Sequence, residues 1–202
     1  MGRLSARERR AAIVDAAVKL FSEKGFRGTT TRELAASVGV SEPVLYQHFA
    51  AKKDLYAAII DAKSNEIDQI TERLRAWMDR DDDHGFFACV ANVILDWHEQ
   101  NPAWLRLFLF SALEKHEMAD LFYERRAQGF FQMITAYVER RMQGGAFRSL
   151  SPEFAAHAFA GMVAHHGLEK VIFRRELPAM DRDAVVDGMV SVFLQGLRQP
   201  AS

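Results

Sequence analysis

Residues 30–49 read TTRELAASVGVSEPVLYQHF, and the pattern of this stretch predicts two short helices joined by a tight turn. Thr30 and Glu33 form a capping box, which marks a helix start, and Gly39 accepts the positive φ that a turn needs. Ser41 then provides the N-cap of a second helix, which ends near the close of the stretch. Two short helices around a glycine-containing turn predict a helix-turn-helix.

The outward side chains of the second helix suit the major groove of a DNA duplex. Gln47 can hydrogen-bond to a base edge, and Val44 can contact a thymine methyl group. The hydroxyl, imidazole and backbone N–H groups around them can bind phosphates. Lys52 and Lys53 stand at the next predicted helix start, where cations oppose the helix dipole, so phosphate contact would explain them. We predict DNA contacts from Thr30, Thr31, Arg32, Ser41, Glu42, Pro43, Val44, Tyr46, Gln47, His48, Lys52 and Lys53.

Charge is distributed unevenly along the chain, although the formal net charge is only −1. Residues 1–53 hold ten Lys and Arg against five Asp and Glu, whereas the remainder holds 16 against 22. A cationic head on an acidic body indicates that only the head meets a polyanion such as DNA.

The rest of the chain is also helical in pattern, with strand signals almost absent. Ser5 and Glu8 form a second capping box, and Gly25 ends the helix that follows. Further helices are predicted over 52–79, 84–100, 102–115, 117–143, 152–174 and 182–198. We therefore expect an all-α fold of about nine helices, with a three-helix DNA-binding domain at 1–52 and a larger ligand-binding and dimerisation domain at 53–202.

The first quarter of the chain resembles a known family. Three segments carry the likeness: Ile13-x-x-Ala16-Ala17-x-x-Leu20-Phe21-x-x-x-Gly25-Phe26, Thr29-Thr30-Thr31-x-x-Leu34-Ala35-x-x-Val38-Gly39-Val40-Ser41, and Leu45-Tyr46-x-His48-Phe49-x-x-Lys52-x-x-Leu55. Together they are similar to the N-terminal domain of the tetracycline-repressor-like (TetR) family. Glu42-Pro43 depart from the pattern, because the family more often has small or polar residues there. An acid at this position either accepts a hydrogen bond from a cytosine amino group or lies off the groove.

The resemblance implies a repressor that binds a palindromic operator in double-stranded DNA as a homodimer. The two heads would then lie about 34–36 Å apart, or a multiple of that, to reach successive major grooves. Family members usually bind a small-molecule effector in the body and dimerise through their last two long helices. The effector would favour a head spacing that no longer fits the operator.

The body is rich in large apolar side chains, beyond what helix packing alone requires. Aromatic rings and methionines together can form a pocket for an apolar or aromatic effector. We predict that the lining comes from Phe86, Val90, Trp97, Trp104, Phe108, Phe122, Phe130 and Met133.

The last two predicted helices have wide apolar faces interspersed with small residues, which permit close helix contact. This pattern favours a symmetric four-helix interface between two copies of the chain, although the same faces could bury within one copy. The residues assigned to dimerisation are Ala158, Gly161, Met162, His165, Leu168, Val185, Met189, Val192 and Phe193.

Several function classes lack support in the sequence. No apolar run approaches the roughly 20 residues of a membrane span, so no membrane partner is expected. The single cysteine, Cys89, is expected to be a buried thiol. A single cysteine fits the reducing cytoplasm, where we expect the protein to act. His165, His166 and Glu169 have no established ligand spacing, so we expect neither a metal nor a cofactor. No phosphate-binding loop or nucleophile elbow is present, and no catalytic residues are predicted.

Two alternatives stay open. The chain could be a helical enzyme or carrier with an incidental helix-turn-helix, but the body lacks a constellation of polar catalytic groups. It could also be a DNA-binding protein of the same fold that takes no ligand and acts structurally or through a protein partner. A well-packed body without a cavity would favour that second alternative.

Overall fold

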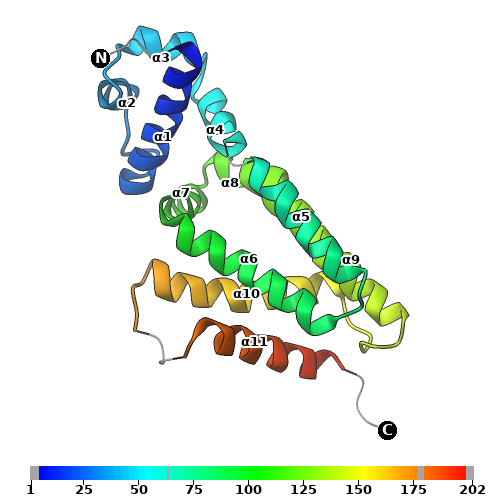
Figure 1. Ribbon diagram of the computed structural model, residues 1–202. Helices are drawn as coiled ribbons and strands as arrows, with labels where there is room; N and C mark the ends of the chain where they lie inside the picture. Colours follow the sequence, from blue (N-terminus) through cyan, green and yellow to red (C-terminus); the bar gives the residue numbers. More distant parts are fainter. Residues whose placement is uncertain (1–4, 63, 177–179, 199–202) are drawn as a thin grey trace. The chain divides into compact units, whose positions relative to one another are not determined.

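The computed structural model describes residues 5–62, 64–176 and 180–198, except for the side chains of Lys52, Arg126 and residues 64–69. Within these ranges the chain forms eleven α helices and one π-helical segment, and no strand (Figure 1). The all-α prediction is therefore confirmed. The chain divides into two compact units, which are residues 1–65 with 103–125, and residues 66–102 with 126–202.

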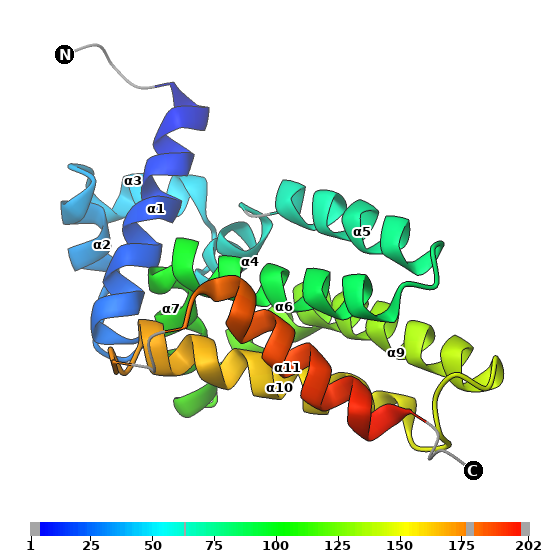
Figure 2. The same cartoon turned by 60° about the horizontal axis from the view of Figure 1, so that its bottom comes forward.

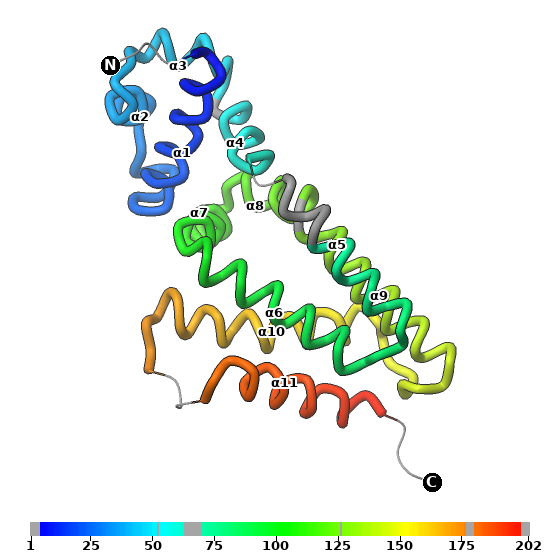
Figure 3. The backbone as a smooth tube through the Cα atoms, viewed as in Figure 1, coloured from blue at the N-terminus to red at the C-terminus, as the bar shows by residue number. Residues whose placement is uncertain are grey.

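The first unit is built around α1 (Ala6–Lys24), with α2 (Thr31–Ser37) and α3 (Glu42–His48) beside it, as the trace in Figure 3 shows. It also contains α4 (Lys52–Asp61), most of α7 (Pro102–Leu113) and α8 (Glu117–Phe122). The core of this unit combines the buried stripe of α1 with apolar side chains from the other five helices.

The second unit contains most of α5 (Ser64–Met78), together with α6 (Asp83–Gln100), α9 (Gln128–Gln143), α10 (Pro152–Val171) and α11 (Arg182–Leu197). Figure 2 shows α10 and α11 running alongside each other, and both pack against α6. Its core is aromatic, because the rings of Phe86 and Tyr137 stack with centroids 3.8 Å apart, and Phe87 lies edge-on to both.

A polar network at the start of α6 connects α6 to α9. The carboxylate of Asp83 accepts a hydrogen bond from the Tyr137 hydroxyl at 2.7 Å. It also receives two hydrogen bonds from the Arg141 guanidinium, at 2.7 and 3.0 Å. Burial first, and then the hydrogen bond to Asp83, raise the pKa of Tyr137, so this hydroxyl stays a donor.

The predicted helix over 52–79 is wrong, because the structure divides it into α4 and α5. Ala62 ends α4 by donating its N–H to the carbonyl oxygens of Ala58 and Ile59. The buried side chains of α4, such as Ile59, belong to the core of the first unit, whereas Leu74 of α5 is buried in the core of the second, so one straight helix would not serve both.

The predicted helix over 117–143 is also interrupted. A five-residue π segment, Tyr123–Ala127, separates α8 from α9. A π turn holds an extra residue and so rotates the apolar stripe around the helix axis. Before the segment the stripe faces the core of the first unit with Met118, and after it the stripe faces the core of the second unit with Ile134 and Tyr137. These two interruptions explain why the described residues form eleven α helices rather than about nine.

The compact units differ from the predicted division at residue 52. Leu55, Leu107 and Met118 are all buried in one cluster with the apolar side chains of α1. α4, α7 and α8 therefore pack with the three predicted head helices.

Most of the predicted helix ends are confirmed. The Ser5–Glu8 and Thr30–Glu33 capping boxes are both formed. Gly39 has a φ of +68° in the turn between α2 and α3, as its position predicted.

Cys89 is buried in the core of the second unit, as expected from the sequence. Among the described helices, none is both long and apolar enough to cross a membrane.

Replacing Phe87 by alanine tests the aromatic core. The ring is fully buried, with Phe159 and Phe193 each at a centroid distance of 4.9 Å. We expect Phe87→Ala to lower the free energy of unfolding by about 3–5 kcal/mol, measured by urea denaturation at a fixed protein concentration.

The matched control is Phe173→Ala, because the Phe173 side chain is 60% exposed. It should change the free energy of unfolding by less than about 0.5 kcal/mol. Equal effects of the two substitutions would show that the aromatic cluster is not the core.

Candidate nucleic-acid interface

The helix-turn-helix is held together by a small apolar core. Leu34 of α2 and Leu45 of α3 are 2% and 3% exposed, and both face Phe21 of α1 across a shared cluster. Ala35, at the crossing of α2, is also buried. Leu45 faces inward, whereas Tyr46 and Gln47, which follow it on α3, are exposed.

The start of α2 is fixed by two reciprocal hydrogen bonds and an ion pair. The Thr30 hydroxyl accepts from the Glu33 N–H at 3.1 Å, and the Glu33 carboxylate accepts from the Thr30 N–H at 3.1 Å. The ammonium of Lys24 lies 2.9 Å from the same carboxylate. The hydrogen bond from Lys24, and then that from the Thr30 N–H, lower the pKa of Glu33 to about 2. Thr30 is thereby held at an exposed helix start, where N–H groups can meet a phosphate.

α3 presents a polar surface with a proline in its first turn. Ser41, Pro43 and Gln47 are exposed, and Tyr46 is 47% exposed. The Ser41 hydroxyl makes no capping hydrogen bond, so Ser41 is the N-cap by backbone position only. The other predicted contacts on this helix, Glu42, Val44 and His48, are half-buried.

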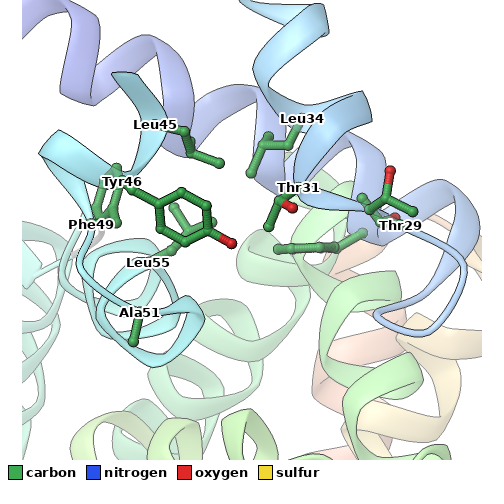
Figure 4. A pocket seen from close by; sticks show the side chains of 10 residues that line it. Thr29, Thr31, Leu34, Leu45, Tyr46, Phe49, Ala51 and Leu55 are labelled. Atoms are coloured by element: carbon green, nitrogen blue, oxygen red, sulfur yellow. The ribbon is translucent and has the colours of Figure 1, made fainter. Parts of the chain in front are cut away.

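A shallow crevice lies between α2 and α3, with Tyr46 along its edge (Figure 4). Thr29, Thr31 and Leu34 line it from the side of α2. Its volume of about 10 Å³ is close to that of a single water molecule. The crevice is therefore a packing gap between α2 and α3 and is too small for a ligand.

Arg10 of α1 braces the C-terminal end of α3. Its guanidinium lies 4.2 Å from the ring centroid of Phe49 and donates a 3.4 Å hydrogen bond to the His48 carbonyl oxygen. These contacts fix where α3 ends. Sequence reasoning missed this role, because an exposed arginine on α1 carries no periodic signal.

The loop between α7 and α8 supports the other end of α1. The imidazole of His116 stacks on the Phe26 ring at a centroid distance of 4.1 Å, and Tyr56 lies edge-on to it at 4.6 Å. The carboxylate of Glu114 accepts the backbone N–H of Arg27 at 3.2 Å. Burial, and then the charges of Glu117 and Glu114, raise the pKa of Tyr56 to about 12. Sequence reasoning also missed these groups, because the contacts join residues far apart in the chain.

Gly25 is required where this support meets α1. Its φ is +72°, and a Cβ atom there would lie 2.3 Å from a carboxylate oxygen of Glu114. A side chain would therefore be strained by the backbone and would also clash with the support.

The remaining predicted DNA contacts belong to the same unit. Arg32 and Lys53 are exposed, and Thr31 is half-buried. The side chain of Lys52 lies outside the described residues. The structure thus places the described members of the predicted set on α2, on α3 and at the start of α4.

The predicted effector-lining residues are divided between the two units. Trp104, Phe108 and Phe122 belong to the first unit, where the last two rings have centroids 4.7 Å apart. The other five belong to the second unit. There Phe86 and Val90 are fully buried in the core, whereas Trp97, Phe130 and Met133 are half-buried.

The predicted dimerisation residues form a partly exposed face of α10 and α11. Val192 of α11 is 67% exposed, and Phe154 of α10, which is not among the predicted residues, is 69% exposed. A Cβ atom added at Gly161 or Gly188 would meet nothing within 4 Å, so both helices present open backbone there. The assigned residues divide between exposed positions (Ala158, Gly161, His165 and Val192) and half-buried ones (Met162, Leu168, Val185, Met189 and Phe193).

α11 is fixed to α6 by Arg182. This guanidinium donates to the carboxylate of Asp96 at 2.7 Å and to that of Glu99 at 3.3 Å. Among the described residues, no group of three or more His, Cys, Asp or Glu side chains could hold a metal ion.

The geometry of α1 to α3, with a polar short helix facing outward on a cationic head, defines a helix-turn-helix DNA-binding domain. Residues 13–59 match the bacterial regulatory proteins of the tetR family, and residues 97–196 match the C-terminal domain of AefR-like transcriptional repressors. The chain belongs to the TetR family of bacterial regulatory proteins.

Individual relatives are similar over different shares of their length. The nucleoid occlusion factor SlmA of Edwardsiella ictaluri is 31% identical over 151 residues, which are 69% of this chain and 71% of SlmA. The transcriptional activator FasR of Mycolicibacterium smegmatis is 37% identical over 78 residues, which are 38% of this chain and 36% of FasR. The SlmA of Citrobacter koseri is matched over 65% of its length.

A solved structure of AibR, in complex with isovaleryl coenzyme A and operator DNA, has the same fold. It superposes with a TM-score of 0.66 at 21% sequence identity and covers 91% of this chain and 97% of AibR.

The ion pair at the start of α2 gives the head a defined pH dependence. The pKa of Glu33 is about 2 in the folded chain, below its ordinary value of 4.5, so its stabilising effect is complete above about pH 4.5. That effect is lost as the pH falls toward about 2. We expect Glu33→Gln to lower the melting temperature near neutral pH, and the deficit to shrink across this interval, measured by circular dichroism.

The control is Glu23→Gln, which removes an exposed carboxylate of α1 that has no ionic partner among the described residues. It should show no such pH-dependent deficit. A deficit for Glu33→Gln that stays constant down to about pH 2 would contradict the assigned ion pair and capping box.

Proposed function

We propose that this chain is a homodimeric repressor of transcription that binds a palindromic operator and is released by a small apolar or aromatic effector. The observation that carries the proposal is the outward polar face of α3. Arg10 of α1 braces the end of α3, and the loop between α7 and α8 supports the other end of α1. In this proposal the protein acts in the cytoplasm and has no catalytic activity.

The head residues divide into base-reading and phosphate-binding groups. Gln47 reads a base edge, and Val44 contacts a thymine methyl group beside it. Thr30, at the capped start of α2, and Lys53, at the start of α4, bind phosphates and set the register. Tyr46 and His48 flank the base-reading residues and also reach phosphates.

The half-buried position of Glu42 supports the second of its two interpretations. A half-buried carboxylate in the first turn of α3 interacts favourably with the positive end of the helix dipole and so stabilises the helix. Glu42 therefore lies at the edge of the groove and contributes more to the helix than to base reading.

Dimerisation through α10 and α11 is supported by the open, apolar and glycine-containing face of these helices. Two copies of the face pack as a four-helix interface with isologous symmetry. A twofold dimer then presents two heads to one duplex. The two heads must lie about 34–36 Å apart, or a multiple of that, to reach successive major grooves.

The assignment as a repressor is supported by the match of residues 97–196 to the C-terminal domain of AefR-like repressors. Regulation by an effector is supported by the fold shared with AibR, which was solved with both isovaleryl coenzyme A and operator DNA. An effector releases DNA only if it binds the DNA-incompetent state more tightly than the competent one.

A second candidate function is DNA binding that acts through a protein partner, without a small effector. The similarity to SlmA, a nucleoid occlusion factor, favours it, because the matched 69% of the chain extends beyond the head into the body. Release of bound operator by a small molecule would exclude this candidate as the sole function.

The experiment that tests the proposed function is selection of bound sequences from a pool of random duplexes, followed by sequencing. We expect a palindrome whose half-sites lie about one helical turn, or a multiple of it, apart. Enrichment of a single asymmetric site, or of no site, would overturn the proposal. The selected duplex then serves to screen small molecules for release.

Gln47 is expected to carry specificity. Gln47→Ala should reduce the preference for the selected operator over a random duplex by roughly 1–3 kcal/mol, because a bidentate base contact is lost. Fluorescence anisotropy of labelled duplexes over a series of salt concentrations measures it.

Lys53→Ala is the matched control for Gln47→Ala, because it removes a phosphate contact. It should weaken binding to both duplexes similarly. It should also reduce, by about one, the magnitude of the slope of log affinity against log salt concentration. An equal loss of specific and non-specific affinity in Gln47→Ala would remove Gln47 from base reading.

Val192 is expected to support dimerisation. Its side chain is 67% exposed in one copy, so Val192→Glu should fold normally, but would bury a charge in the dimer. We expect a monomer in sedimentation at a concentration where the parent is dimeric, with loss of operator binding. Gln143→Glu adds the same charge at an exposed position of α9 and should stay dimeric. A dimeric Val192→Glu would place the interface elsewhere.

A further inference from the structure

A groove between α5 and α9 in the second unit has the properties of a ligand site. One stripe of α9 lines it with Gly129, Gln132, Met133, Ala136 and Arg140, which recur at the three- and four-residue spacing of one helix face. The other side is lined by Arg75 and Met78 at the end of α5, and by Asp79, which follows the helix. Its volume of about 340 Å³ lies within the range of roughly 300–1,000 Å³ typical of small-molecule sites.

Two small residues of the α9 stripe, Gly129 and Ala136, leave space in the groove. Ala136 carries only a methyl group, and a Cβ atom added at Gly129 would meet nothing within 4 Å. A stripe of larger residues would close the space between the two helices.

The inner surface of the groove is apolar and adaptable. Met78 and Met133 pack against the buried core of the second unit and also line the groove. Methionine side chains are unbranched and polarisable, so they adjust to ligands of different shape. This lining suits an alkyl chain or a ring.

The charged residues of the groove are two arginines and one aspartate. Arg75 has no ionic partner among the side chains that the structure describes. Arg140 is anchored by Asp81 at 2.6 Å and by the carbonyl oxygen of Met78, through a single guanidinium nitrogen. Its other N–H groups make no hydrogen bond with described residues. The groove is therefore lined by two guanidinium groups and one carboxylate, that of Asp79. Both guanidinium groups have N–H donors that make no hydrogen bond with described residues.

We propose that the α5–α9 groove binds a small amphipathic anion, with its apolar part on Met78 and Met133 and its carboxylate on Arg75. A guanidinium matches a carboxylate with two parallel hydrogen bonds, which a neutral head group cannot reproduce. The assignment narrows the apolar effector of the proposed function to one that also carries an anionic head group. That the bound anion acts as the effector rests on the proposed function, whereas its binding to the groove does not.

The test is calorimetric titration of the DNA-free full chain with octanoate, octanol and octylammonium, which share one alkyl chain. Octanoate should bind most tightly. In NMR spectra of methyl-labelled methionine, it should shift the resonances of Met78 and Met133. Octanol that binds as tightly as octanoate, or more tightly, would overturn the assignment of an anion site. Octylammonium that does so would overturn it too, because Asp79 would then be the dominant charge of the groove.

Two classes of variant separate the head group from the chain. Arg75→Ala should weaken octanoate about tenfold or more and leave octanol unchanged, because a charge-assisted hydrogen bond is lost. Ala136→Phe and Gly129→Leu should each weaken both ligands by filling the groove from different ends, and both positions are exposed, so folding should be retained. Arg148→Ala, which removes an exposed arginine of the same unit outside the groove, is the matched control and should bind like the parent.

A final titration with the selected operator distinguishes failure of this site from failure of the proposed function. Octanoate should release the parent from the duplex, whereas Arg75→Ala should bind the duplex normally and resist release. Unchanged octanoate binding in Arg75→Ala and in both filled variants would overturn the site, whether or not the chain binds DNA.

Discussion

The buried stripe of α1 is the contact on which the head depends. Ile13 and Ala17 are fully buried, and Phe21 is 2% exposed, so one side of this helix is removed from water from Ile13 onward. α2, α3 and α4 can bury their own apolar side chains only against this stripe or the cluster around it. Burial of a large apolar side chain contributes about 1.5–3 kcal/mol, so helices of seven residues, which are unstable alone, are held in place by α1.

Exposed and polar groups then refine what the core has positioned. Lys24 and Glu33 fix the start of α2, and Arg10 fixes the end of α3. Exposed ion pairs contribute little stability in water, so the value of these contacts lies in geometry. A recognition helix must present its side chains in one register, because a displaced base contact loses specificity before it loses affinity.

The interior of the second unit is filled by structural contacts. Asp83, Tyr137 and Arg141 form a satisfied polar network, and Phe87 and Phe159 fill the space beside it. The α10–α11 face, proposed to bind a second copy, and the α5–α9 groove, proposed to bind a ligand, both lie outside this interior. The aromatic richness of the body was taken from the sequence as a sign of a pocket. For Phe86 and Val90 the structure instead shows side chains fully buried in the core.

The sequence by itself determined the all-α fold, the capping boxes, the turn at Gly39 and the exposure of Ser41, Tyr46 and Gln47. These features depend on neighbours within a few positions, through helix caps, positive φ and a 3.6-residue period. Only the tertiary structure decided the break between α4 and α5, the π segment at Tyr123–Ala127 and the support of Phe26 by His116. The physical reason is the same in each case: these features depend on which core an apolar stripe faces and on contacts across long stretches of chain. A pattern of local periodicity contains no information about either.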